Sequence, residues 1–307
     1  MEPIENILAC LDLTEIDDYV ISYAAHTAEI FRAQSATFVH VIQAYDLPDR
    51  RSKSFPDVKS SLNSMIQEEL DERIDPAFRQ KVKTEVAIRV AEVNAADEIL
   101  SFVRETNTDL MLLGQKHGED REGRYGRRVA AESGCDIVFV PENPPDGVSA
   151  ILCAIDYSSS STGAFDRALH LQQTLGASVT CYYIQDVTKT YFPVSTSKSA
   201  SRSQSRAEAK HRQLIESFGL NPDDYPCRID TTDQLASEAE KICRIADEEK
   251  ADLVIVGAQG DTASETSLLG NVSETLRRME KYTPVMIVKH VQDKKFFSEI
   301  IGRVTTS

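Results

Sequence analysis

Three glycines in the last quarter of the chain have a spacing that could bind a phosphate. Gly257, Gly260 and Gly270 form the pattern Gly-x2-Gly-x9-Gly and follow residues 252–256, an apolar run with the length and β-branched composition of a strand. A glycine at the end of a strand lets the backbone approach a ligand without an obstructing Cβ, and the N–H groups at the start of a helix attract an anion. The stretch 251–288 therefore indicates a strand, a phosphate-binding loop, a helix and a final strand.

This loop matches neither of two common phosphate-binding motifs. No Gly-Lys-Ser/Thr follows at the spacing of a P-loop, and the glycines do not form Gly-x-Gly-x-x-Gly. The helical spacing of Val272, Leu276 and Met279 predicts the helix after the loop, and Pro284 prevents that helix from continuing. On spacing alone, the glycines could also serve only to make tight turns.

The charge of the chain argues against two classes of partner. Acidic residues outnumber basic ones 49 to 34 among 307 residues, which gives a formal net charge of −15. A nucleic-acid or anionic-membrane surface needs clustered Lys and Arg, so we expect neither partner. A small phosphate ligand remains compatible with this charge, because backbone N–H groups can bind it.

The cysteines and the first residues favour a cytoplasmic protein. The six cysteines are scattered without a Cys-x2-Cys pair, which favours reduced thiols over a disulfide framework or a zinc site. The start, MEPIENILACLDL, lacks the basic and apolar regions of a signal peptide. No apolar run approaches the roughly 18 residues of a membrane helix. We therefore expect no metal centre and no membrane segment.

The chain contains one unit twice. Three pairs of segments match, namely residues 6–12 with 150–156, residues 108–114 with 250–257, and residues 136–140 with 284–288. A register this steady indicates a duplicated domain with a boundary in the turn-rich stretch 142–149. The predicted organisation is a first domain over residues 1–145, a second over residues 146–292, and a tail over residues 293–307.

Each domain alternates strand and helix patterns. In the first domain, strands are predicted over 4–11, 36–42, 82–90, 110–113 and 137–140, and helices over 17–33, 61–73 and 95–105. In the second, strands are predicted over 150–155, 177–184, 226–230, 252–256 and 284–289, and helices over 162–175, 206–218, 234–249 and 272–281. The serine-rich stretch 195–205 is predicted to be a mobile loop. This alternation predicts parallel βαβ units in a doubly wound α/β fold.

The strand that ends in Asp, the glycine pattern and the final strand together resemble the universal stress protein family in its tandem two-domain form. The resemblance covers nearly the whole chain. It implies two tandem open, mostly parallel five-stranded sheets flanked by helices, Rossmann-like and similar to the adenine-nucleotide alpha-hydrolases, packed as a pseudo-dimer. One branch of the family binds ATP or AMP through this glycine loop. Members pair through an edge strand, so we expect the two domains to pair with each other, or the protein to form a homodimer.

The resemblance assigns the adenosine side of a site in the second domain. Asp156 is expected to hydrogen-bond the ribose hydroxyls, a task that suits a carboxylate. Ile184 is expected to contact adenine through its backbone. Val256, Gly257 and Gly260 are expected to line the adenosine and the α-phosphate. From its position alone, Asp156 could instead cap the following helix, as could residues 158–161.

The resemblance assigns the outer phosphates, with or without Mg, to the start of the next helix. Gly270, Asn271, Val272 and Ser273 are the expected contacts. The family usually has Ser or Thr at the position of Asn271. Since Asn can donate to a phosphate or cap a helix, the change bears on phosphate preference more than on binding.

The first domain departs further from the family pattern. Asp12 still follows its first strand, but Gly118 comes one residue late after Gly114, and the segment before the last strand is five residues shorter. We therefore expect a degenerate nucleotide loop. The arginines of this segment could replace backbone donors for an anion or form a solvated charge cluster at a helix start; they are Arg121, Arg124, Arg127 and Arg128.

No local signature of catalysis is present. No Ser-His-Asp or Cys-His set and no paired carboxylates can be assembled, so we expect no enzyme, although slow ATP hydrolysis stays open. His26 and His170 fall at equivalent helix positions and favour packing or surface roles, while Asp109 and Asp252 precede the fourth strands as turn or cap residues. The main hypothesis is a cytoplasmic stress-response regulator that binds ATP or AMP in its second domain. The alternative is a tandem scaffold that binds no nucleotide and acts through unidentified protein partners.

Overall fold

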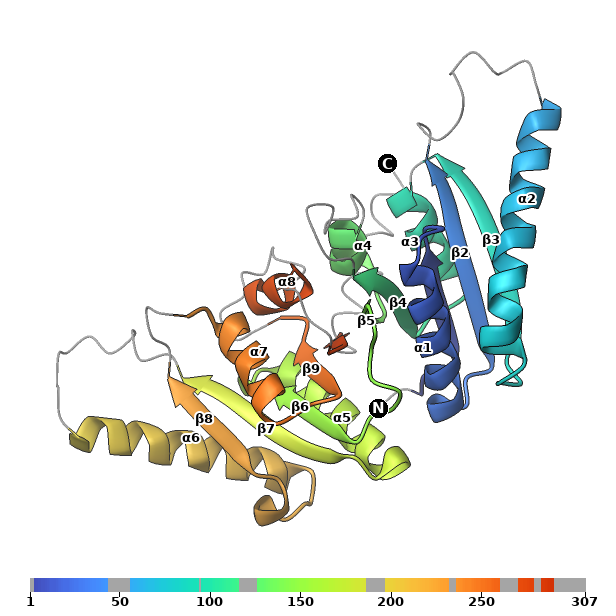
Figure 1. Cartoon of the computed structure of the whole chain (residues 1–307). Coiled ribbons are helices and arrows are strands. Elements are labelled where there is room, and N and C mark those ends of the chain that lie inside the picture. Colours follow the sequence, from blue (N-terminus) through green and yellow to red (C-terminus); the bar gives the residue numbers. More distant parts are fainter. Residues whose placement is uncertain are drawn as a thin grey trace. The chain divides into compact units, whose positions relative to one another are not determined.

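The computed structural model describes residues 3–43, 56–93, 95–115, 126–185, 197–231, 236–259, 270–278 and 283–289. The principal division of the chain falls between Pro145 and Asp146 and separates two compact units, in each of which strands and helices alternate (Figure 1). The predicted tail, residues 293–307, lies outside the described residues.

The first unit is built on a parallel sheet with the strand order β3-β2-β1-β4-β5. Its elements are β1 (Asn6–Leu11), α1 (Ile16–Phe31), β2 (Ser35–Gln43), α2 (Pro56–Ile74), a π-helical turn η2 (Asp75–Arg79), β3 (Glu85–Val93), α3 (Ala95–Glu105), β4 (Leu110–Gln115), α4 (Gly126–Glu132) and β5 (Asp136–Pro141). All six residues of β5 are buried, as expected of a parallel strand.

The second unit has the corresponding order β8-β7-β6-β9-β10, again with parallel pairing. Its elements are β6 (Ala150–Ala154), α5 (Ser159–Leu175), β7 (Ser178–Gln185), α6 (Ser197–Ser217), a 3₁₀ turn η3 (Pro222–Asp224), β8 (Cys227–Thr231), α7 (Glu238–Glu248), β9 (Leu253–Gly257), α8 (Asn271–Arg278) and β10 (Val285–Val288). The predicted α/β fold with mostly parallel sheets flanked by helices is confirmed.

The connections determine where a ligand can bind. In the second unit the chain runs from β6 outward to β8 and then returns to β9 on the other side of β6. Right-handed crossovers then place α5 and α6 on one face of the sheet and α7 and α8 on the other. The order reverses between β6 and β9, so the crevice beyond the carboxyl ends of these two strands is the binding position of such a sheet.

Local signals explain where α5 starts and stops. Ser158 is its N-cap, with a side chain that accepts from the N–H of Ser161, and Gly176 ends the helix with φ of 71°. A positive φ suits glycine because it has no Cβ to clash with its own backbone. Both signals are local, and they place the start of α5 directly beyond the carboxyl end of β6.

One predicted element is wrong. The serine-rich composition predicts a mobile loop over 195–205, but α6 begins at Ser197 and continues to Ser217. No Gly or Pro interrupts this stretch, and its continuation buries Ala207, His211 and Ile215 on one face. A helix anchored in this way can extend into a serine-rich stretch, so composition alone is a poor guide here. Helix α4 was not among the predicted elements either.

Candidate functional site

The residues predicted to hold adenosine lie at the carboxyl ends of β6, β7 and β9. Asp156 follows β6, Ile184 lies near the end of β7 and is half-buried, and Gly257 ends β9. Val256 is only 3% exposed, so its side chain belongs to the core of the sheet and only its backbone could face a ligand. The sheet therefore brings these segments, distant in the sequence, to one edge.

Asp156 is oriented by the residue that caps α5. Its Oδ1 accepts hydrogen bonds from the Ser158 Oγ at 2.6 Å and the Ser158 N–H at 3.0 Å. Between them, Tyr157 adopts a φ of 67°, in the left-handed region. The cap of α5 is thus Ser158, and the Asp156 carboxylate holds that cap in place from the side of the crevice.

Gly257 is required by a close approach between β9 and α5. A Cβ at this position would lie 2.7 Å from both the carbonyl carbon and the Oγ of Ser160, and 2.8 Å from the N–H nitrogen of Ser161. No side chain fits at that distance. Gly257 therefore serves to bring the start of α5 against the end of β9 rather than to supply a left-handed turn.

The start of α8 is tied to the end of β9. The N–H of Gly270 donates to the carbonyl of Ala258 at 2.7 Å, and the Oγ of Ser273 donates to the carbonyl of Gly257 at 2.8 Å. Ser273 is only 3% exposed. Gly260 lies outside the described residues; Asn271 begins α8 and Val272 is half-buried in its first turn, but the side chain of Asn271 is not described.

Two features of this edge of the sheet suit an adenine nucleotide. Asp156 presents a carboxylate beyond the end of β6, and the N–H groups of the first turn of α8 have no acceptor within the helix. A helix start of this kind attracts phosphate through its N–H groups and its dipole.

An aromatic group that sequence reasoning missed lies next to Asp156. The rings of Tyr157 and Tyr183 meet edge to face with centroids 4.8 Å apart, and Lys210 Nζ lies 5.6 Å from the centre of the Tyr157 ring. The Tyr157 hydroxyl reaches the carbonyl of Ala207 at 3.4 Å, and burial raises its pKa. This contact ties the turn after β6 to α6. The only sequence signal was a tyrosine directly after the repeated Asp.

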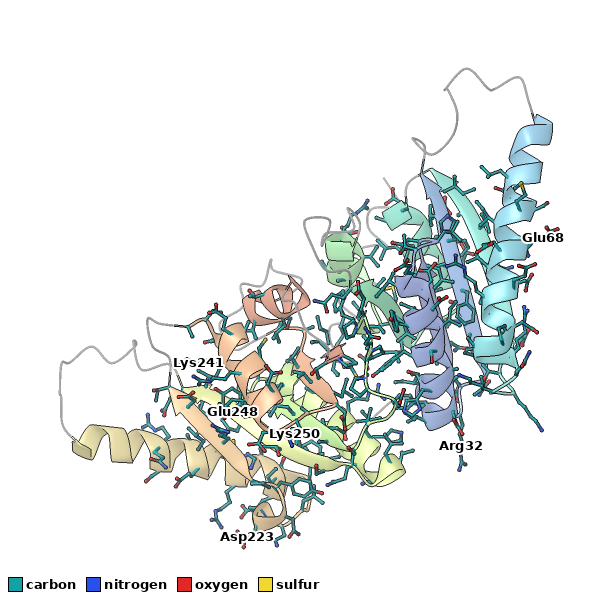
Figure 2. The ribbon with its side chains drawn as sticks, viewed as in Figure 1. Arg32, Glu68, Asp223, Lys241, Glu248 and Lys250 are labelled. Atoms are coloured by element: carbon teal, nitrogen blue, oxygen red, sulfur yellow. The ribbon has the colours of Figure 1, made fainter. Side chains whose placement is uncertain are left out.

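Polar groups also gather at the ends of β7 and β8. Lys241 of α7, labelled in Figure 2, is only 2% exposed, and its Nζ donates to the carbonyl of Thr231. The hydroxyl of Tyr182 donates to Asp230 at 3.2 Å, and Arg244 contacts the same carboxylate at 3.3 Å. These contacts join α7 to the carboxyl end of β8, beside the position expected for the base.

The corresponding edge of the first unit has the same turn but a different residue against its glycine. Asp12 accepts from the Thr14 hydroxyl at 2.5 Å, as Asp156 does from Ser158, and Leu13 has a φ of 62° like Tyr157. Ile16, however, occupies the position of Ser160, and its Cγ1 lies 2.8 Å from where a Cβ of Gly114 would be. An apolar side chain thus takes the place of a hydroxyl at this wall.

Some of the remaining residues singled out from the sequence lie in the described part of the chain, and others do not. Arg128 forms ion pairs with Asp97 at 2.6 Å and Glu132 at 3.0 Å, which accords with a surface charge cluster. His170 is exposed on α5 and His26 is half-buried on α1. Gly118, Arg121 and Arg124 lie outside the described residues, as does the side chain of Arg127.

Asp109 and Asp252 have the same structural role in the two units. The Oδ2 of Asp109 accepts from the N–H groups of Glu5 and Asn6, both at 2.9 Å. The Oδ2 of Asp252 accepts from the N–H of Ser149 at 2.8 Å and that of Ala150 at 3.0 Å. Each carboxylate therefore supports the start of the central strand at the amino edge of its sheet, opposite the crevice.

The six cysteines are free thiols in this structure, and four of them are buried. Among the described residues, no cluster of three or more His, Cys, Asp or Glu side chains could hold a metal ion. In the same part of the chain, no helix combines the length and apolar character needed to cross a membrane.

Known proteins resemble both the sequence and the fold. The sequence model of the Universal stress protein family matches residues 3–141 and again residues 148–289. A universal stress protein of Methanocaldococcus jannaschii is 24% identical over 139 residues, which cover 45% of this chain and 81% of that protein.

Crystal structures of known proteins match nearly the whole length of this chain. A protein of unknown function from Pseudomonas aeruginosa PAO1 has a TM-score of 0.68 at 14% identity and covers 98% of each chain. A universal stress protein from Archaeoglobus fulgidus has a TM-score of 0.65 at 16% identity, covering 92% of this chain and 98% of its own. At these identities the structural likeness concerns the fold alone.

Proposed function

Because the chain belongs to the universal stress protein family, we propose that it is a cytoplasmic regulator of the stress response whose second domain binds ATP or AMP. The observation that carries this proposal is the crevice between the ends of β6 and β9. There Asp156 is held by Ser158 at 2.6 Å, and Gly257 lets the start of α5 approach the end of β9.

Each part of the nucleotide has a candidate contact. The Asp156 carboxylate would accept from the ribose hydroxyls, since its orientation is already set by the cap of α5. The backbone at Ile184 would face the base. The phosphates would meet the first turn of α8, where helix N–H groups and the helix dipole favour negative charge. Mg²⁺, where present, would be held mainly by the phosphates, because Mg²⁺ keeps several waters and needs few protein ligands.

A single site per chain is part of the proposal. In the first unit Ile16, at the position of Ser160, packs against Gly114, and the glycine spacing of the following loop departs from that of the second unit. This contrast supports nucleotide binding in the second domain and a degenerate loop in the first. The pairing of the two domains, and any homodimer, stay predictions from the family resemblance.

The test begins with the purified protein, denatured so that any bound nucleotide is released and counted. We expect about one adenine nucleotide per chain. Asp156→Ala and Gly270→Glu should abolish retention while the proteins keep the wild-type circular dichroism spectrum. Asp12→Ala, the matched substitution in the first domain, should leave retention unchanged. Retention of nucleotide by both second-domain variants would contradict the proposal.

The second candidate is a tandem scaffold that binds no nucleotide and acts through protein partners. The altered glycine spacing of the first domain and the Asn at position 271 favour it. It predicts that no nucleotide is released, and that millimolar ATP or AMP leaves the melting temperature unchanged, because a ligand that binds only the folded state must raise that temperature.

An enzymatic role is the third candidate. Slow ATP hydrolysis would require turnover that depends on the second-domain site. If ATP turnover survived in Asp156→Ala, the activity would come from another site or another protein. We propose a binding function without a dedicated catalytic group.

A further inference from the structure

Main-chain polar groups of the last residue of β9 and of the two residues after it are bound within the protein. Ala258 donates its N–H to the carbonyl of Val288 at 2.9 Å, and its own carbonyl accepts from Gly270. The N–H of Gln259 donates to the Oγ of Ser160 at 3.2 Å. The carbonyl of Gly257 accepts from Ser273. The segment 257–259 is therefore fixed by the starts of both α5 and α8.

These hydrogen bonds determine which groups can meet a phosphate. A backbone N–H has one hydrogen, so the N–H groups of Ala258, Gln259 and Gly270 are occupied by the contacts just given. The first N–H groups of α8, in contrast, have no carbonyl to bond within their own helix. Among the described residues on this side of the crevice, the donors open to a phosphate are thus those of the first turn of α8.

The hydroxyl of Ser273 takes part in the same arrangement. It is buried, with 3% of its surface exposed, and donates at 2.8 Å to the last residue of β9. A hydroxyl has a single hydrogen, so this bond uses its donor. Ser160, also 3% exposed, uses its oxygen to hold Gln259 from the opposite side.

We infer that Ser160 and Ser273 are positioning residues for the phosphates: their hydroxyls clamp residues 257–259 between α5 and α8 and so aim the first turn of α8 into the crevice. The inference rests on the proposed nucleotide site. It assigns phosphate contact to the main chain of α8 rather than to the Ser273 hydroxyl. The first unit cannot form the same clamp, because Ile16 stands at the position of Ser160.

The clamp predicts an effect that depends on phosphate. Ser273→Ala and Ser160→Ala should each weaken binding of ATP and AMP about fivefold, roughly the value of one hydrogen bond. Binding of adenosine, which makes no phosphate contact, should change by less than about twofold, since the clamp acts on α8 and not on the ribose position. Ser273→Thr retains the donor and should recover most of the affinity for ATP.

Isothermal titration of the full-length protein with ATP, AMP and adenosine provides the measurement. The matched control is Ser178→Ala, since the hydroxyl of Ser178 donates to the carbonyl of Ser149 at 3.2 Å at the amino edge of the same sheet. This control should bind all three ligands as the wild type does. Thermal melting of each apo variant checks that the fold is retained.

The possible titration results distinguish a failure of the proposed clamp from a failure of the proposed nucleotide site. Equal losses for ATP and adenosine would show that the serines only support the fold, and would overturn the inference. Unchanged ATP binding in both alanine variants would also overturn it, while the proposed function would stand. If the wild type bound none of the three ligands, the proposed function would fail and the inference with it.

Discussion

Asp17 in the first domain and Ser161 in the second occupy equivalent positions and accept the same backbone hydrogen bond. The Asp17 carboxylate accepts from the N–H of Asp12 at 3.0 Å, and the Ser161 hydroxyl accepts from the N–H of Asp156 at 3.3 Å. Asp17 also accepts from Leu13 at 2.7 Å and is only 1% exposed. One domain has thus placed a buried carboxylate where the other has a neutral hydroxyl.

This carboxylate should make the stability of the first domain depend on pH. Burial raises the pKa of Asp17 to about 6, against the opposing effect of its backbone hydrogen bonds. The folded state therefore binds the proton more tightly than the unfolded state, so stability is lost as the pH rises through 6. The difference between this pKa and the ordinary value of 3.8 corresponds to about 3 kcal/mol of unfolding free energy.

Asp17→Asn removes this titration. As the pH is raised from 4.5 to 7.5, the wild type should lose unfolding free energy that the variant keeps, as measured by urea denaturation. Ser161→Ala is the control, since its effect should be the same at both pH values. A constant difference between Asp17→Asn and the wild type would contradict the prediction.

The close approach at Gly257 predicts a steric effect. In Gly257→Ala the new Cβ would meet the backbone of Ser160 at 2.7 Å, and the start of α5 would have to shift. We expect a loss of about 1–3 kcal/mol in unfolding free energy, together with weaker nucleotide binding. Gly147→Ala is the matched control, because a Cβ there meets no atom within 4 Å. Equal stability of the two variants would argue against the packing described here.

His211 should give the second domain the opposite pH dependence. Its Nε2 lies 2.7 Å from the carbonyl of Tyr225, so this nitrogen must carry the hydrogen, while Nδ1 is buried with no partner among the described residues. Burial lowers the pKa of His211, against the effect of that hydrogen bond. Protonation is thus less favourable in the folded state, and stability is lost as the pH falls below the unfolded value of about 6.5.

The variant His211→Gln keeps a donor for Tyr225 and removes the titration. Between pH 8 and pH 5.5 the wild type should lose more unfolding free energy than the variant, measured by urea denaturation of the full chain. The sign is opposite to that for Asp17, so the two effects can be told apart in one protein. Parallel losses in variant and wild type would refute this role of His211.

Asp252 provides a test of the amino edge of the sheet. Asp252→Ala would remove the acceptor for the N–H groups of Ser149 and Ala150 and for the Ser149 hydroxyl, which lies at 2.6 Å. We expect a loss of about 1–3 kcal/mol in unfolding free energy, because the N–H groups lose their acceptor. Nucleotide retention should not change, since the proposed site lies at the other edge. A loss of bound nucleotide without a loss of stability would place Asp252 in the site instead.

Much of the fold could be predicted from local patterns. The helix 95–105 was predicted with the bounds that the structure has, and the strands near Asp12 and Asp156 were found within two residues of their ends. The prediction failed for residues 197–205, because a helix there depends on the packing of the residues that follow it. Strand β3, predicted over 82–90, begins at Glu85, since its register is set by pairing with β2.

The candidate site could be predicted only as a set of positions. The glycine spacing pointed to Gly257, but its close approach to Ser160 joins residues nearly a hundred positions apart. The sequence allows Asp156 or any residue of 158–161 as the cap of α5. The structure identifies Ser158 as the cap. The contacts of Tyr157 with Tyr183 and Lys210 had no sequence signal beyond residue type.

The sequence by itself determined the duplicated α/β architecture and the edge of the sheet where a ligand would bind, because hydrophobic periodicity, helix caps and repeat register act over short distances along the chain. Only the tertiary structure decided which hydroxyls and carboxylates meet at that edge. Ser160, Ser273 and Asp17 acquire their roles from partners brought close by the crossing of strands and helices. Such contacts depend on distances of a few tenths of an ångström, which no spacing along the chain contains.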